Sequence, residues 1–397
     1  MQRNIIRQYY ILSGLFTIGG LSIISAIYST FLIKNGLSLF EVNLVNAAYY
    51  LTIFLCEIPT GAFADIFGRK TSFVSACGFM CLSMFIYGSS HTFTGFVCAE
   101  IVAAIGFTFR SGAFKAWLVD SLKHHGYEGG YTKIFGRGNL ICQIGGGIGA
   151  VAGSYIAVRN PTLPWFIGGT IMALTTAIAY FTMEEHYFVK GVFSWKRGWS
   201  AMRNVIASSV KYGTQHKTVR FILTITCVQI FAVQALNMYW QPFFKNHGVS
   251  EQHFGFLFTG MMISLAVGAF LVSRLKNTGN EKRIILKSQI CTGLCIILAT
   301  IIPGLPCIVI LFLLHEVPRG YWGPMIDDYL HQRIPSHERA TIASFCSIAP
   351  HICGAIGLLV SGIVAQCFGI SVAWIVSGIV LIAGALIVAK NGNEGSD

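Results

Sequence analysis

GAFADIFGRK, residues 61–70, joins two long apolar segments of the chain, Val42–Phe63 and Thr71–Ser90. Each segment has roughly the 20 residues that an α-helix needs to cross the hydrocarbon core of a bilayer. Aspartate, arginine and lysine seldom lie so close to hydrocarbon unless they orient the chain or make specific contacts. Residues 61–70 therefore predict a short charged turn between two membrane helices.

Apolar segments of this kind recur along the whole chain. Hydrophobic residues make up 54% of the sequence and charged residues only 11%, whereas a soluble domain has about 25% charged residues. The twelve candidate spans are Gln8–Ile33, Val42–Phe63, Thr71–Ser90, Phe93–Asp120, Asn139–Val158, Leu163–Met183, Phe221–Phe244, Phe254–Val272, Ile284–Ile302, Cys307–Ile326, Ala340–Phe368 and Ser371–Ala389. So many segments argue against a soluble protein with buried helices. We therefore expect an all-α membrane protein with twelve transmembrane helices.

The basic residues behind the net charge of +12 are distributed along the chain as expected for a membrane protein. If the N-terminus is cytoplasmic, 22 of the 28 Lys and Arg residues fall in cytoplasmic segments. The outer loops hold Lys34, Arg159 and Lys245, and the spans hold Arg110, Lys115 and Arg319. By the positive-inside rule, both termini are expected on the cytoplasmic side of the cell inner membrane. The basic surplus then indicates anionic membrane lipid as a partner, and not nucleic acid.

The chain repeats itself with a shift of 208 residues. Five of fifteen positions match when Gln143–Ala157 is aligned with His351–Ala365. The repeat predicts two homologous six-helix bundles, residues 1–183 and 221–397, and parallel repeats of this kind are typical of transporters. Between them, residues 184–220 form a long polar segment with two acids and seven bases. Its apolar residues recur at three- and four-residue steps, which favours a helix on the inner leaflet over a solvated linker.

The pattern Gly-x-x-x-Asp-x-x-Gly-Arg-Lys, placed after the second of twelve apolar segments, resembles the signature loop of the major facilitator superfamily. In that family the loop lies on the cytoplasmic side, between the second and third helices. The resemblance implies the major facilitator fold, with two pseudo-symmetric six-helix bundles and a cavity lined by the first, fourth, seventh and tenth helices. Residues 106–117, GFTFRSGAFKAW, resemble a bacterial exporter branch that handles drugs and siderophores.

The resemblance also implies a conformational latch on the cytoplasmic side. Asp65, Arg69 and Lys70 match the charged residues of the family's loop. The family pairs this arginine with an acid at the inner end of the fourth helix, which is Asp120 here. The alternative is that these charges only orient the chain. No comparable acidic motif follows the span Phe254–Val272, so the latch is expected in the first bundle alone.

Charged residues also occur deep inside two spans. A charge at the centre of a membrane helix costs about 2.5–3.5 kcal/mol on insertion scales, so it normally faces a cavity or a partner. The fourth span holds Glu100 and Arg110. In the tenth span, Glu316 and Arg319 are three residues apart and can reach each other. We expect Arg110, Glu316 and Arg319 in the substrate cavity, the alternative being that Glu316 and Arg319 form a permanent pair without a substrate role.

Glu316 is the expected proton-coupling residue, and Glu100 is the second candidate. Burial disfavours a charged carboxylate, whereas the neighbouring Arg319 favours it. An anionic solute that engaged Arg319 would therefore free Glu316 to take up a proton. Glu100 lies nearer the outer surface and is expected to stay hydrated.

Uncharged polar and aromatic residues on the expected cavity helices complete the predicted site. They offer hydrogen bonds and stacking to an organic solute, although some of them would only bond across helices. These residues are Tyr28, Gln143, Gln229, Gln234, Asn237, Tyr239, Trp240 and His351. In antiporters of the family a Gly-Pro often lies in the glycine run of the fifth helix, but here Gly149 is followed by Ala150, so the antiport motif is incomplete.

The expected function is secondary active transport by alternating access, namely proton-coupled export of a small organic molecule such as a drug or siderophore, with anions among the candidates. The alternatives are a nutrient-uptake symporter or facilitator and, in a different class, a non-transporting sensor with the same fold. The sequence has no Walker loop, nucleophile elbow or metal-ligand spacing, and its twelve cysteines lie mostly within spans. We therefore expect a monomer that is not an enzyme and has no cofactor and no metal.

Overall fold

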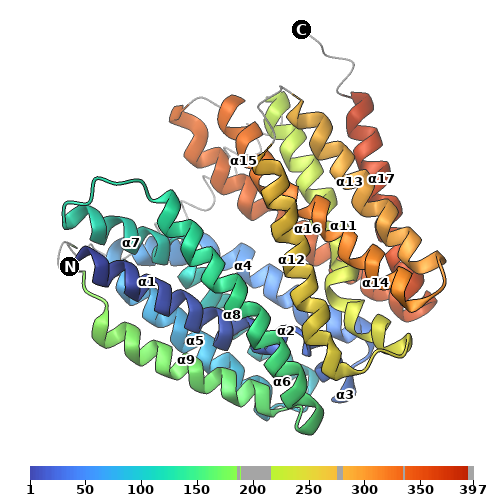
Figure 1. Ribbon diagram of the computed structural model, residues 1–397, viewed down its shortest axis with the longest axis horizontal. Helices are drawn as coiled ribbons and strands as arrows, with labels where there is room; N and C mark the ends of the chain where they lie inside the picture. Colours follow the sequence, from blue (N-terminus) through green and yellow to red (C-terminus); the bar gives the residue numbers. More distant parts are fainter. Residues whose placement is uncertain (186–187, 189–215, 275–279, 334–335, 392–397) are drawn as a thin grey trace. The chain divides into compact units, whose positions relative to one another are not determined.

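The computed structural model describes residues 1–185, 188, 216–274, 280–333 and 336–391. Every regular element in these ranges is a helix (Figure 1). Eleven helices of the described residues are long and apolar enough to cross a membrane. Residues 189–215, which contain most of the predicted surface helix between the bundles, lie outside the described residues.

The chain divides into two compact units. Unit 1 comprises Met1–Asn35, Ala48–Arg203 and Ser250–Thr259. Its helices are α1 (Gln2–Thr17), η1 (Ile18–Ser22), α2 (Ile23–Ser25), α3 (Tyr28–Lys34), most of α4 (Leu39–Phe67), α5 (Arg69–Ser89), α6 (Phe93–Arg110), α7 (Ala113–His124), α8 (Thr132–Arg159) and α9 (Leu163–Thr182). Within this unit α5 packs against α6 and α9, and α1 packs against α8 (Figure 1).

Unit 2 comprises Gly36–Ala47, Asn204–Val249 and Gly260–Asp397. Its helices are α11 (Lys217–Asn246), most of α12 (Phe254–Ser273), α13 (Glu281–Ile301), α14 (Leu305–Leu314), α15 (Glu316–Arg333), α16 (Ser336–Phe368) and α17 (Ile370–Asn391), while the short η2 (Glu251–His253) belongs to unit 1. Here α11 packs against α16, and α13 packs against α17 (Figure 1).

Three of the predicted spans are interrupted. Gly112, with a φ of +71°, separates α6 from α7 inside the span predicted at Phe93–Asp120, because glycine adopts positive φ without a steric penalty. The span predicted at Cys307–Ile326 is divided at His315. Pro318 lacks the N–H that would bond to the carbonyl of Leu314, so α14 ends there. The first predicted span, Gln8–Ile33, is broken around Ala26 and Ile27.

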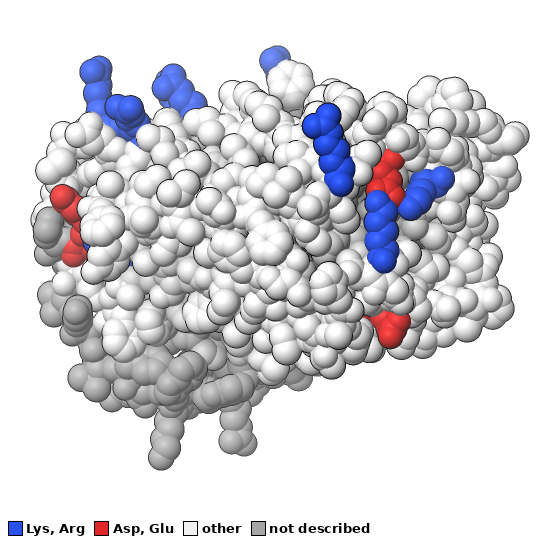
Figure 2. Space-filling view, turned by 90° about the horizontal axis from the view of Figure 1, so that it is seen from below, with Lys and Arg blue, Asp and Glu red and all other residues white. Residues whose placement is uncertain are grey.

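Large apolar side chains are exposed along the outer faces of the helices. On α8, Leu140, Ile144 and Ile148 are 59%, 56% and 63% exposed. Figure 2 shows one face of the molecule on which charged side chains are few and most of the surface is uncharged. Soluble proteins rarely expose apolar patches of this extent. These faces are therefore suited to contact with lipid, and the buried residues, among them Trp117, Trp165 and Trp374, form the cores within the units.

Glycines allow the closest helix contacts. A Cβ added to Gly153 on α8 would overlap the backbone carbonyl oxygen of Ile23 on α2. In unit 2, a Cβ on Gly357 of α16 would overlap the backbone of Phe231 on α11. Small residues allow the backbones of membrane helices to approach each other in this way. Gly153 of α8 and Gly357 of α16 thus lie at backbone-to-backbone contacts within their own units.

Candidate functional site

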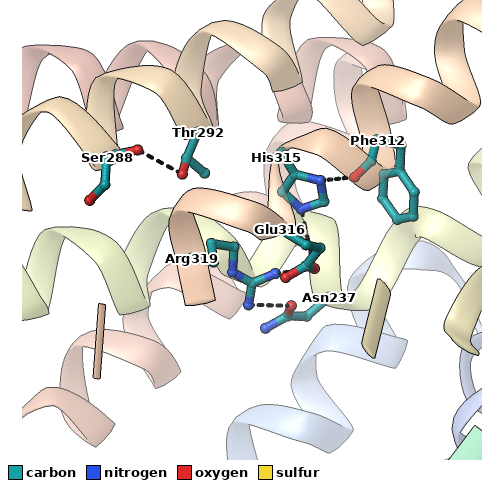
Figure 3. A network of polar contacts seen from close by, with 7 residues as sticks. All are labelled: Asn237, Ser288, Thr292, Phe312, His315, Glu316 and Arg319. Atoms are coloured by element: carbon teal, nitrogen blue, oxygen red, sulfur yellow. Dashed lines mark hydrogen bonds and ion pairs between the residues drawn. The ribbon is translucent and has the colours of Figure 1, made fainter. Parts of the chain in front are cut away.

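Glu316, at the start of α15, forms an ion pair with Arg319 one turn later (Figure 3). Arg319 donates from Nη1 to Oε1 of Glu316 at 2.6 Å, and from Nη2 to Oδ1 of Asn237 on α11 at 3.4 Å. The side chain of Glu316 is 1% exposed, whereas that of Arg319 is 18% exposed. The guanidinium is therefore the member of the pair that a solute can reach.

His315 adjoins this pair at the junction of α14 and α15 (Figure 3). Its Nδ1 donates to the backbone carbonyl oxygen of Phe312, and its Nε2 lies 3.3 Å from Oε1 of Glu316. His315 is buried, and neither its Nε2 nor Oε2 of Glu316 makes a hydrogen bond to a residue that the structure describes. His315 was not among the predicted site residues, although its place beside Glu316 was a signal for it.

The uncharged residues predicted for α11 have different surroundings. The hydroxyl of Tyr239 donates to the backbone oxygen of Leu39 at 2.9 Å. Gln234 is buried, and its side-chain amide has no hydrogen-bond partner among the described residues; Oε1 of Gln229 is in the same situation. The other predicted residues of unit 2 are Trp240, which is buried on α11, and His351, which is half-buried on α16. Of this set, only Asn237 contacts the Glu316–Arg319 pair through a described hydrogen bond.

In unit 1, Arg110 ends α6 and lies over an aromatic ring. Its guanidinium carbon is 4.3 Å from the ring centroid of Phe16 on α1. The negative face of an aromatic ring attracts a cation at this distance, and the attraction is stronger where water is excluded. Gln143 of α8 is half-buried in the same unit. Arg110 is thus held by a cation–π contact that the sequence did not indicate.

Glu100 lies in an aromatic cluster of unit 1 and is only 6% exposed. The hydroxyl of Tyr87 donates to Oε2 of Glu100, and the hydroxyl of Tyr28 lies 3.3 Å from that of Tyr87. The ring of Trp165 stacks on Tyr87 with the centroids 4.2 Å apart. The expectation that Glu100 stays hydrated is therefore wrong for this structure, because Glu100 is buried and bonded to Tyr87. Tyr87 and Trp165 were not predicted.

The residues of the predicted latch lie near one another at one end of unit 1. Arg69, the first residue of α5, donates from Nη1 to Oδ2 of Asp120 on α7. The carboxylate of Glu185 accepts from the backbone N–H groups of Arg69 and Lys70 at 2.9 and 3.0 Å. An acid at the N-terminus of a helix satisfies free N–H groups and complements the helix dipole. Glu185 was missed by the sequence reasoning, and Asp65 is exposed near the end of α4.

Unit 2 has an ion pair at the corresponding place, with the charges reversed. Glu281, the first residue of α13, lies 3.2 Å from Nη2 of Arg333, the last residue of α15. The guanidinium of Arg333 also lies 4.0 Å from the ring centroid of Tyr329. The sequence predicted a charged contact only in the first bundle. The structure adds this second pair, which a search for the same charges in the same order could not detect.

The described side chains are suited to binding a solute. Among the residues that the structure describes, no three His, Cys, Asp or Glu side chains are grouped as metal ligands. In unit 2, a reachable guanidinium lies beside an amide and a buried carboxylate. Such groups fix the orientation of a polar organic molecule through ion pairs and hydrogen bonds.

A profile of the Major Facilitator Superfamily matches residues 10–213 and 221–391. The chain belongs to the Major Facilitator Superfamily. It is therefore a multi-pass membrane transporter of a small-molecule substrate and not an enzyme. The superfamily and the fold class predicted from the sequence are confirmed. The narrower resemblance to drug and siderophore exporters stays a prediction.

Relatives cover nearly the whole chain. An uncharacterized MFS-type transporter of Bacillus subtilis, YxaM, is 23% identical over 374 residues, which are 91% of this chain and 90% of that one. Another of Methanocaldococcus jannaschii, MJ1560, is 27% identical over 44% of this chain and 43% of its own. Among solved structures, the nucleoside transporter NupG superimposes with a TM-score of 0.81 at 14% identity, covering 98% of both chains. The human organic anion transporter MFSD10 gives 0.69 at 12% identity, covering 98% and 99%.

Proposed function

We propose that this member of the superfamily transports a small organic anion by alternating access and couples the movement to protons. The observation that carries the proposal is the Glu316–Arg319 pair. Its carboxylate is buried, whereas its guanidinium is partly exposed and lies beside Asn237 of a second helix. A buried charge pair of this kind within a membrane helix marks a substrate or proton pathway by default. The guanidinium is the natural contact for an anionic group.

The direction of transport depends on how the proton and the substrate affect each other. Export by antiport, the direction that the resemblance to exporters favours, requires that they compete for the site. Uptake by symport, the second candidate, requires that each favours the binding of the other. One observation favours the second candidate. The site holds Glu316, Arg319 and a histidine, so protonation makes its net charge more positive and favours an anion.

The pH dependence of substrate affinity distinguishes these directions. Small organic anions are screened by thermal shift on the purified protein, and each hit is tested by counterflow in proteoliposomes. The affinity of a hit is then measured as a function of pH. Higher affinity at lower pH indicates symport, and lower affinity at lower pH indicates antiport. A protein that binds hits but shows no counterflow with any of them is a sensor, and the proposal fails.

We further propose that Asp65, Arg69, Lys70 and Asp120 act as a cytoplasmic latch. The Arg69 and Asp120 side chains are 27% and 34% exposed, and an ion pair this exposed contributes only about 0–1 kcal/mol to stability. Replacement of Arg69 by Asp should therefore slow transport without a large fall in thermal stability. The double variant Arg69→Asp/Asp120→Arg should recover part of the transport rate, because it restores an attractive pair.

Lys133→Asp is the matched control for this prediction. Lys133 is exposed on α8 of the same unit, and the substitution changes the charge by the same amount. If Lys133→Asp slows counterflow as much as Arg69→Asp, or if the double variant recovers nothing, residues 61–70 act only as an orientation signal.

The proposed topology places both termini in the cytoplasm and the chain, as a monomer, in the cell inner membrane, with anionic lipid at the basic inner surface. Reporter fusions at Asn35 and His247 should then report the outer side, and a fusion at Gly198 should report the cytoplasm. The basis is the distribution of Lys and Arg, which favours the cytoplasmic side. Because the two outer fusions and the cytoplasmic fusion have opposite expected signals, a protein that failed to insert would not reproduce the pattern. A cytoplasmic signal at Asn35 would contradict the topology.

A further inference from the structure

The contacts of His315 determine which of its nitrogens carries a proton. A backbone carbonyl oxygen can only accept a hydrogen bond, so the Nδ1 that faces the oxygen of Phe312 carries a hydrogen. In a neutral imidazole, Nε2 is then a bare acceptor. That Nε2 lies 3.3 Å from Oε1 of Glu316. Two acceptors at this distance repel each other, and a proton on one of them turns the repulsion into attraction.

The position of Arg319 decides where that proton resides. Arg319 donates to the same Oε1 at 2.6 Å, and this contact stabilises the ionised carboxylate. The Arg319 cation therefore disfavours a proton on Glu316. The proton between the two acceptors therefore belongs on Nε2 of His315, which is buried and has no other hydrogen-bond partner among the described residues.

Few other titratable groups lie close enough to His315 to hold the proton in its place. α14 and α15 contact α11 and α13, and α12 approaches them at Gly260 and Gly268. From α17, Trp374 stacks on Phe312, and the one titratable side chain of α17 is Lys390 near its C-terminus. In the part of α13 that follows Lys287, the only titratable groups are the thiols of Cys291 and Cys295. The helix α12 has no titratable side chain. Between Arg220 and Lys245, α11 has Cys227 and Tyr239, and the tyrosine hydroxyl donates to Leu39. From α11, Asn237 presents an uncharged amide to Arg319.

We propose that His315 carries the coupling proton on Nε2, and that the Glu316–Arg319 pair holds it there. The inference rests on the proposed proton coupling and names its carrier. The Nε2–H bond forms with a proton from water on one side of the membrane and breaks when the proton returns to water on the other. With the proton bound, the three side chains have a net charge of one positive unit. An organic anion that contacts Arg319 neutralises this charge, so the proton and the anion favour each other's binding.

The test is a nitrogen NMR spectrum of the full-length protein, labelled with ¹⁵N-histidine and held in lipid nanodiscs without substrate near neutral pH. The ring signals of His315 are identified by their loss in His315→Gln. If that variant does not fold, ¹³C-carbonyl phenylalanine gives the assignment, because Nδ1 contacts the Phe312 carbonyl. We expect both ring nitrogens of His315 to be protonated in the wild type, and only Nδ1 to be protonated in Glu316→Gln.

Glu281→Gln is the matched control, because it removes another buried, ion-paired carboxylate of unit 2. It should leave the His315 signals unchanged. A wild-type spectrum with one protonated nitrogen, or an identical spectrum in Glu316→Gln, would overturn the inference. The spectrum needs no substrate, so its result is independent of the transport assay. Accumulation driven by a pH gradient in a protein whose His315 is neutral would refute His315 as the carrier and leave the proposed function standing. A charged His315 in a protein that transports nothing would refute the proposed function.

Discussion

Glu316→Gln should abolish transport against a gradient while substrate binding and exchange persist. The amide of Gln can donate a hydrogen bond to Nε2 of His315, so the neutral imidazole no longer needs the coupling proton. Arg319 stays in place and can still hold an anion. The variant should therefore equilibrate substrate but not concentrate it. The measurements are counterflow and pH-gradient-driven accumulation in the same proteoliposomes, with a hit from the anion screen as the probe.

Loss of a buried carboxylate also affects stability, and the experiment must separate the two effects. Removing one partner of a buried ion pair typically destabilises a protein by about 3–5 kcal/mol. Glu281→Gln removes a carboxylate that is also buried and paired with an arginine, but it lies at the far end of α15 from Glu316. Accumulation should survive in Glu281→Gln. If Glu316→Gln still accumulates substrate with the pH dependence of the wild type, Glu316 takes no part in coupling. Equal losses of binding and exchange would indicate a fixed pair that shapes the cavity.

Gly153→Ala should prevent the normal packing of unit 1. The added methyl group would overlap the carbonyl oxygen of Ile23, and both atoms belong to or adjoin rigid backbone, so a helix must move. Overpacking of this kind typically costs about 1–3 kcal/mol and occasionally more. We expect a clear fall in the thermal unfolding temperature in detergent and a loss of counterflow.

Gly136→Ala provides the control on the same helix. Nothing lies within 4 Å of a Cβ built on Gly136, so the substitution adds a methyl group without a clash. In a helix, alanine is favoured over glycine by about 1 kcal/mol, and this variant should be as stable as the wild type or more so. Equal behaviour of Gly153→Ala and Gly136→Ala would show that the contact between α8 and α2 tolerates an extra carbon.

Hydropathy predicted the approximate positions of the helices because bilayer thickness sets their length. The span predicted at Thr71–Ser90 is α5, Arg69–Ser89, and the span predicted at Ile284–Ile302 is α13, Glu281–Ile301. The interruption at Gly112 was not predicted. A window of about 19 residues averages over a local break, and the break depends on one backbone dihedral angle or one missing hydrogen bond.

The candidate site was predictable only where its partners are close in sequence. Glu316 and Arg319 are one helical turn apart, so their contact follows from helix geometry. Glu185 contacts backbone groups 115 and 116 residues away, and no periodicity within either segment indicates such a contact. For Glu100, the position along the helix indicated depth in the membrane. That position gave no information on Tyr87, which bonds to Glu100 from a neighbouring helix.

The reversed polarity of the two terminal ion pairs has a mechanical consequence. In unit 2 the acid lies at the N-terminus of α13 and the base at the C-terminus of α15, so both helix dipoles strengthen the pair. In unit 1 the base begins α5 and the acid lies toward the C-terminal end of α7, so both dipoles oppose the pair, each by about 0.3–1 kcal/mol. We therefore expect the Glu281–Arg333 pair to hold α13 and α15 together more strongly than the Arg69–Asp120 pair holds α5 and α7, so that the contact in unit 1 is the easier of the two to break.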